Sequence, residues 1–92
     1  MNSYAMYEIK VQAKPFAKIR KDVKSIIKFV VFDFINHNYR RMFPVTIDSI
    51  YQDDRAVVYV LEGTKTTIRH IYETINRIHP ASCTKLKNVE IE

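Results

Sequence analysis

A chain of 92 residues that is 47% apolar and 27% charged has the composition of a small globular protein, and we expect residues 1–92 to form one domain. Its single glycine and single cysteine exclude glycine-rich phosphate loops, an internal disulfide and a site of several thiolates. The net charge is +5: residues 1–46 carry about +6, from nine Lys/Arg and three acidic residues, and residues 47–92 carry about −1, from six basic and seven acidic residues. This asymmetry indicates an acidic partner for the first half, although lysine also serves solubility alone.

The first half predicts a strand and then a long helix. Apolar and polar side chains alternate over Met6–Ala13, which is typical of a strand, and Pro15 ends it. From Phe16 to about Asn38 the apolar residues step by three or four, which predicts an amphipathic helix. Its predicted core stripe consists of Ile19, Val23, Ile26, Val30 and Phe34. The β-branched and aromatic run at 29–35 also suits a buried strand, so that segment stays open between helix and strand.

The second half predicts a hairpin, a helix and a final strand. Val45–Gln52 and Ala56–Glu62 are rich in β-formers and are separated by Asp53, Asp54 and Arg55, which favour a turn. A helix follows that is capped by Thr64 or Thr66, ends before Pro80 and carries Ile68, Ile71, Ile75 and Ile78 at helical spacing. The last predicted strand is Thr84–Ile91. The order βαββαβ predicts an α+β ferredoxin-like sandwich, in which two helices cover one face of a four-stranded antiparallel sheet.

The segment VYVLEGTKTTIRHIYETINRI (Val58–Ile78) resembles the third strand and second helix of blue-light flavin-sensing (BLUF) domains. It is also similar to acylphosphatases, in which a strand ends in Glu-Gly and a proline follows the second helix. Both resemblances imply a ferredoxin-like fold. The BLUF glutamine that contacts flavin would fall at Tyr59, the acylphosphatase asparagine would fall near Tyr51, and VQAKPFAKIR has no phosphate loop. The resemblance therefore implies the fold without either activity, and we expect no cofactor.

RNA-recognition modules share this order of elements and stack bases on aromatic side chains of their two central strands. Here Tyr59 stands in the segment that corresponds to the longer aromatic motif, and Tyr7 is its candidate companion on the first strand. The alternative is that both tyrosines are half-buried strand residues.

A basic stripe is the most informative pattern in the sequence. Lysines spaced by three or four residues fall within an arc of about 120° on one helix face, opposite the apolar stripe. Such lysines repel each other unless an anion lies over them, and nucleic-acid phosphates would fill that role. A merely solvated helix face is the alternative. The predicted residues for binding a nucleic acid or an acidic partner are Lys14, Lys18, Lys21, Lys24, Lys28, Arg40 and Arg41.

Further along the same predicted helix, Phe32, Ile35 and Tyr39 lie beyond the core stripe. A helix that is apolar nearly all round is usually covered by protein, so these residues predict a protein interface and a homo-oligomer.

We expect no enzyme and no metal site. His37, His70 and His79 lack the spacing of metal ligands, and Cys83 has no second thiol and nothing to orient His79 beside it. We also expect a cytoplasmic protein without membrane contact, because the N-terminus lacks an apolar signal core and Asp33 interrupts the longest apolar run.

Two functions follow from these features. The first is a small basic non-enzymatic regulator that binds nucleic acid, with RNA favoured, through the lysine-rich helix face. The alternative is a dimeric inhibitor or adaptor that binds a host protein, of the kind that phages and mobile elements encode. Direct binding to RNA as a function of salt separates the two.

Overall fold

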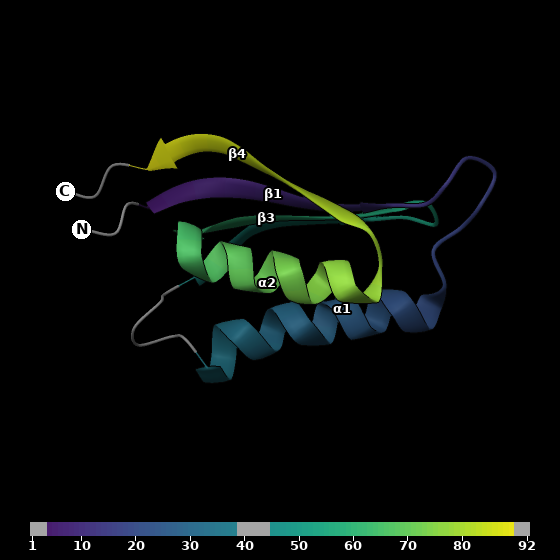
Figure 1. The fold of residues 1–92 in the computed structure, drawn as a ribbon, viewed down its shortest axis with the longest axis horizontal. Coiled ribbons are helices and arrows are strands. Elements are labelled where there is room, and N and C mark those ends of the chain that lie inside the picture. Colours follow the sequence, from purple (N-terminus) through teal and green to yellow (C-terminus); the bar gives the residue numbers. More distant parts are fainter. Residues whose placement is uncertain (1–3, 39–44, 90–92) are drawn as a thin grey trace.

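The computed structural model describes residues 4–38 and 45–89 and has two layers, a sheet and a pair of helices on one of its faces (Figure 1). The sheet is antiparallel throughout and its strand order is β2-β3-β1-β4. This arrangement confirms the predicted ferredoxin-like α+β fold. In chain order the elements are β1 (Tyr4–Gln12), α1 (Lys21–Asp33), the π-helical turn η1 (Phe34–Asn38), β2 (Val45–Gln52), β3 (Ala56–Thr64), α2 (Lys65–Ile78) and β4 (Ala81–Val89).

The core lies between the helices and the two central strands. Ile9 of β1 pairs with Tyr59 of β3, and Val11 pairs with Val57. Because strand side chains alternate between faces, all four point toward the helices, where each is buried. Their neighbours Val58 and Val60 therefore point to the opposite face, which no element of the described chain covers.

Helix α2 has the position and phase that the sequence predicts. Thr64 is its N-cap, and its hydroxyl oxygen accepts a hydrogen bond from the backbone N–H of Thr67 at 3.4 Å. At the other end, the Asn76 side-chain oxygen accepts a hydrogen bond of 2.9 Å from the backbone N–H of Ala81. The stripe on α2 packs into the core through three fully buried isoleucines, and a fourth is partly buried: Ile68, Ile71, Ile75 and Ile78.

Helix α1 differs from the prediction in its start and at one position of its predicted core stripe. It begins at Lys21 rather than Phe16, because the preceding residues form a loop in which the N–H of Ile19 donates to the carbonyl of Asp54 at 2.8 Å. Ile19 is buried, but from this loop and not from a helix. The predicted core position Ile26 is wrong, since this side chain is 47% exposed while Ile27 and Val31 are fully buried. The other predicted stripe residues, Val23, Val30 and Phe34, are partly buried and pack against the core.

The segment 29–35 is helical, which decides between the two structures that its sequence allows. Helix α1 runs through Asp33, and the π-helical turn η1 continues to Asn38. No helix within residues 4–38 and 45–89 is long and apolar enough to cross a membrane.

Both edge strands carry an irregularity in their pairing. On β2, Ile47 pairs with Leu61 and Ser49 pairs with Val60, so Asp48 is an extra residue. On β4 the pairing of β1 moves from Lys87 to Lys85, which makes Leu86 the extra residue. β4 also starts earlier than predicted, at Ala81 rather than Thr84.

Candidate functional site

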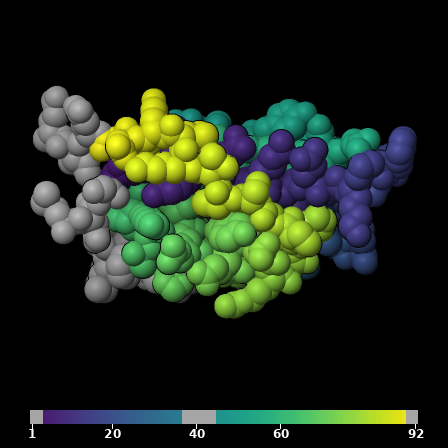
Figure 2. Space-filling model, turned by 45° about the horizontal axis from the view of Figure 1, so that its top comes forward, coloured from purple at the N-terminus to yellow at the C-terminus, as the bar shows by residue number. Residues whose placement is uncertain are grey.

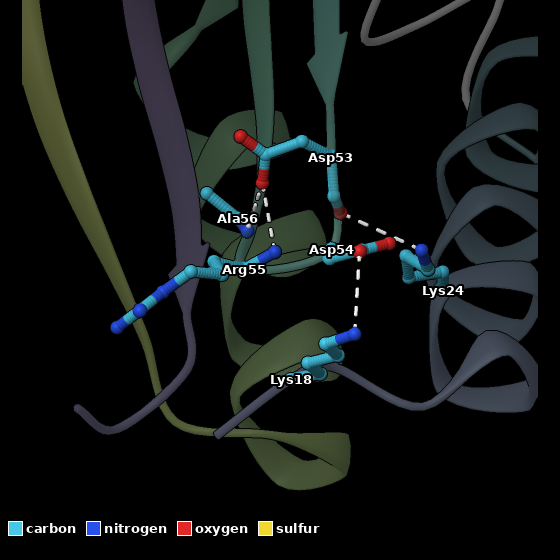
Figure 3. A network of polar contacts seen from close by, with 6 residues as sticks. All are labelled: Lys18, Lys24, Asp53, Asp54, Arg55 and Ala56. Carbon is cyan, nitrogen blue, oxygen red and sulfur yellow. Dashed lines mark hydrogen bonds and ion pairs between the residues drawn. The ribbon is translucent and has the colours of Figure 1, made fainter. Parts of the chain in front are cut away.

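The structure turns two of the predicted basic residues toward the β2–β3 hairpin (Figure 3). The ammonium nitrogen of Lys18 lies 3.7 Å from a carboxylate oxygen of Asp54, and both side chains are largely exposed. The ammonium group of Lys24 donates to the carbonyl oxygen of Asp53 at 3.5 Å. Lys18 belongs to the loop before α1 and Lys24 to the helix, so the two together tie this end of α1 to the hairpin.

The hairpin turn is built around the carboxylate of Asp53. One of its oxygens accepts hydrogen bonds from the backbone N–H groups of Arg55 and Ala56, at 2.7 and 2.8 Å, and the other accepts one from the hydroxyl of Tyr51. The bond from Tyr51 is the main reason why the pKa of Asp53 is lowered, and the two backbone bonds lower it further. The turn therefore keeps its negative charge beside the lysines of α1.

Lys21 and Lys28 remain on the outer face of α1. They lie seven residues apart and so point in nearly the same direction, and both are exposed. Neither forms an ion pair with any described residue, while the Lys28 ammonium nitrogen lies 6.0 Å from the centre of the Phe32 ring. Lys14 is exposed in the preceding loop, and Arg40 and Arg41 lie outside the described residues.

The apolar surface of α1 differs in part from the predicted set of Phe32, Ile35 and Tyr39. Ile35 packs against the core and Phe32 is half-buried, while Tyr39 lies outside the described residues. The large apolar side chains that α1 exposes are instead Phe29, at 71% exposure, and Ile26. Phe29 stands next to Lys28 and on the same side of the helix as Lys21. The outer face of α1 thus combines an exposed ring with two cations that have no ion-pair partner in the described part of the chain.

Tyr7 and Tyr59 are not available as a stacking pair. Tyr59 is 1% exposed and Tyr7 packs against the core, both on the face that the helices cover. Burial raises the pKa of Tyr59, and its hydroxyl has no hydrogen-bond partner among the described residues. The alternative interpretation of these two residues, as strand residues turned inward, is therefore correct.

A second basic cluster lies in the second half of the chain, which has no excess of basic over acidic residues. A recess of about 420 Å³ opens between α2 and β4, with β1 beneath it. Its lining consists of Tyr7, Lys65, Ile68, Arg69, Tyr72, Cys83 and Lys85. The sequence alone shows that Lys65 and Arg69 lie one turn apart on one face of α2. That Lys85 of β4 joins them can be seen only from the register of the sheet.

The described residues contain no group of three or more His, Cys, Asp or Glu side chains that could hold a metal ion. The ring nitrogen Nδ1 of His79 lies 2.9 Å from the carbonyl oxygen of Pro80. Partial burial raises the pKa of the Cys83 thiol, which disfavours the reactive thiolate.

No family model matches this sequence, and no curated protein matches it either. Among solved structures, the chain is similar to a de novo designed protein with a ferredoxin fold, with a TM-score of 0.59 and 17% identity over 98% of this chain and 88% of that one. At this identity the similarity shows the fold alone, and it agrees with the topology described above.

Two further solved structures have lower TM-scores. One is a protein from methicillin-resistant Staphylococcus aureus that is described provisionally as an aminohydrolase, with a TM-score of 0.46 and 19% identity over 95% of this chain. This chain spans 29% of that protein. The other is the de novo designed protein Foldit4, with a TM-score of 0.43 and 14% identity over 99% of this chain and all of the designed one.

Proposed function

We propose that this chain is a small non-enzymatic regulatory protein that binds RNA with the outer face of α1 and the loop before it. The observation that carries the proposal is that Phe29, Lys21 and Lys28 are all exposed on the outer surface of α1, where the two lysines have no ion-pair partner among the described residues. Proteins that bind single strands combine cations for the phosphates with aromatic rings for the bases, and α1 offers both on one surface.

The arrangement favours single-stranded RNA over duplex DNA. No element of the described fold forms a helix-turn-helix, so no recognition helix is available for the major groove. Stacking on one ring contributes about 1–3 kcal/mol per base and tolerates any base. Lysine contacts to phosphates position a nucleic acid without specifying its sequence. Binding is therefore mainly electrostatic, with weak sequence preference.

A salt titration of binding to a fluorescently labelled single-stranded RNA tests the proposal. If the three cations Lys14, Lys21 and Lys28 each neutralise a phosphate, the log–log salt slope is about −2, at about 0.7 per contact. The double variant Lys21→Glu/Lys28→Glu should weaken binding and reduce the magnitude of the slope by about 1.4.

The matched control is Arg77→Glu/Lys87→Glu, which makes the same charge change at exposed positions of α2 and β4. It should retain most of the affinity and the full slope. Equal loss in both double variants, or no detectable binding of the unmodified protein at about 0.15 M salt, contradicts the proposal.

A dimeric inhibitor or adaptor that binds a protein is the second candidate, and the apolar ridge of α1 favours it. Ile26, Phe29 and half-buried Phe32 step by three residues along the helix, as anchors in helix docking do. A charged substitution, Phe29→Asp, separates the candidates through sedimentation equilibrium. A wild-type dimer that this variant converts to a folded monomer supports the second candidate, whereas a monomeric wild type that binds RNA supports the first.

A further inference from the structure

The recess between α2 and β4 gathers side chains from three elements that are distant in sequence. Cys83 and Lys85 are alternate residues of β4, and they pair with Ile9 and Tyr7 of β1, whose side chains face the helices. Lys65 and Arg69 stand one turn apart on the flank of α2. In Figure 2 atoms of β1 (purple) are visible at the bottom of a hollow between β4 (yellow) and α2 (green).

The charge in this recess is positive and unbalanced. Its lining contains three cations and no carboxylate among the described residues, and none of the three forms an ion pair with a described residue. Lys65 also stands in the first turn of α2, which has no acidic residue although the N-terminus of a helix is itself positive. Glu73, one turn beyond Arg69, does not line the recess. An anion between these cations would remove their mutual repulsion.

The rest of the lining suits a flat apolar group. Ile68 is fully buried at the base, and the rings of Tyr7 and Tyr72 are half-buried. Tyr72 is held in place because its hydroxyl donates to the carbonyl oxygen of Ala81 at 3.3 Å. Since burial raises the pKa of the Cys83 thiol, that side chain is neutral at pH 7 and does not repel an anion. The volume of about 420 Å³ lies in the range of small-molecule sites.

We propose that this recess binds a small aromatic phosphate of the class of nucleoside monophosphates. The phosphate lies between Lys65, Arg69 and Lys85, where the guanidinium of Arg69 offers a bidentate contact and the two ammonium groups add charge. The base lies against the apolar part of the lining. The same chemistry is presented by a free mononucleotide and by one nucleotide of an RNA strand, so the experiment includes both.

Two-dimensional amide NMR of the ¹⁵N-labelled full chain, titrated with uridine monophosphate, tests this site. We expect saturable shifts confined to amides of β1, the first two turns of α2 and β4, with a dissociation constant of about 1 mM or lower. Uridine lacks the phosphate, so its dissociation constant should be at least tenfold higher. Inorganic phosphate should shift only the amide signals near Lys65, Arg69 and Lys85. Shifts that do not saturate, or that lie elsewhere, overturn the proposal.

Charge removal at the recess gives the second measurement. Arg69→Gln and Lys85→Gln should each weaken the binding of uridine monophosphate by about tenfold, because each removes a charge-assisted hydrogen bond. Arg77→Gln, on the same helix but outside the lining, is the matched control and should bind like the unmodified protein. The spectra themselves show whether each variant is folded. Unchanged affinity in folded Arg69→Gln and Lys85→Gln contradicts the proposal.

A single-stranded RNA is the other arm of the experiment, and it separates this site from the proposed RNA surface on α1. If the recess holds a nucleotide of a strand, Arg69→Gln weakens RNA binding as well as mononucleotide binding. If the recess binds a free mononucleotide instead, Arg69→Gln weakens only mononucleotide binding, and Lys21→Glu/Lys28→Glu weakens only RNA binding. If the protein binds RNA but no mononucleotide, this inference is refuted and the proposed function stands. If it binds a mononucleotide but no RNA, the proposed function is refuted and this inference stands.

Discussion

The two helices lie side by side on the same sheet face, but they relate to it in different ways (Figure 1). Helix α2 starts at the side-chain cap of Thr64 and buries three isoleucines along one stripe. Helix α1 starts at Arg20 without a side-chain cap and continues into a π-helical turn. It also exposes Ile26 and Phe29.

This difference shows which residues the fold requires. Nearly every apolar side chain of α2 packs into the core, and the flank of the helix that lines the recess carries Lys65, Arg69 and Tyr72. Helix α1 carries more apolar side chains than its contact with the sheet can cover. Residues that folding does not use, such as Phe29, are the ones available for a partner. The predictions below test this contrast in order of decreasing expected effect.

The largest effect is expected from truncating one buried isoleucine of α2. Ile71 is fully buried, so Ile71→Ala should lower the free energy of unfolding by about 2–5 kcal/mol, from lost burial and the cavity left behind. The matched substitution on α1 is Ile26→Ala, which should change it by less than about 0.5 kcal/mol because the side chain is 47% exposed. Urea unfolding of both variants gives the two values, and similar losses would remove the contrast between the helices.

A smaller effect is expected at the start of α2. Thr64→Ala removes the hydroxyl that caps the helix and should cost about 1 kcal/mol in stability, which corresponds to about 4–8 °C in Tm. Thr64→Ser keeps the hydroxyl and should recover most of that loss. Arg20→Ala at the start of α1 should have little effect, because the Arg20 side chain does not cap the helix. Thermal unfolding followed by circular dichroism measures all three, and a loss of stability in Arg20→Ala that matches Thr64→Ala would contradict the contrast.

The smallest effect concerns the hairpin turn that holds the start of α1. The folded state lowers the pKa of Asp53 from its ordinary value of 3.8, so the ionised carboxylate stabilises the fold above that pH and the contribution is lost as the pH falls below it. Asp53→Asn should therefore be less stable than the unmodified protein at pH 7. The two should converge in Tm as the pH falls through the lowered pKa of Asp53, because the carboxylate is then protonated. A difference in Tm that does not change with pH would mean that the charge of Asp53 is irrelevant to the turn.

The sequence predicts most of the fold because its signals are local. The strand boundaries of β2, the cap at Thr64 and the isoleucine spacing of α2 are all set by residues within a few positions of one another. The start of α1 is not local, since it depends on Ile19 bonding to Asp54 across the sheet end. Counting a helix from Phe16 misses that bond and places Ile26 in the core, where the structure has Ile27 instead.

The candidate sites are less predictable for the same reason. The lysine spacing predicts a common face, but the structure directs Lys18 and Lys24 toward the acidic hairpin and leaves Lys21 and Lys28 on the outer face. The recess combines Arg69 of α2 with Tyr7 and Lys85, which the pairing of β1 with β4 brings together. A charge count by halves of the chain cannot detect a cluster of that kind.

The extra residues in β2 and β4 have a consequence for the behaviour of the protein at high concentration. An open four-stranded sheet has two free edges, and a regular edge is a template on which further chains can add as strands. Here each edge strand is interrupted, by Asp48 on one side and by Leu86 between Lys85 and Lys87 on the other. A bulge misaligns the free amide and carbonyl groups, and flanking charges oppose an incoming copy. The sheet is thereby protected at both edges against growth into a fibril.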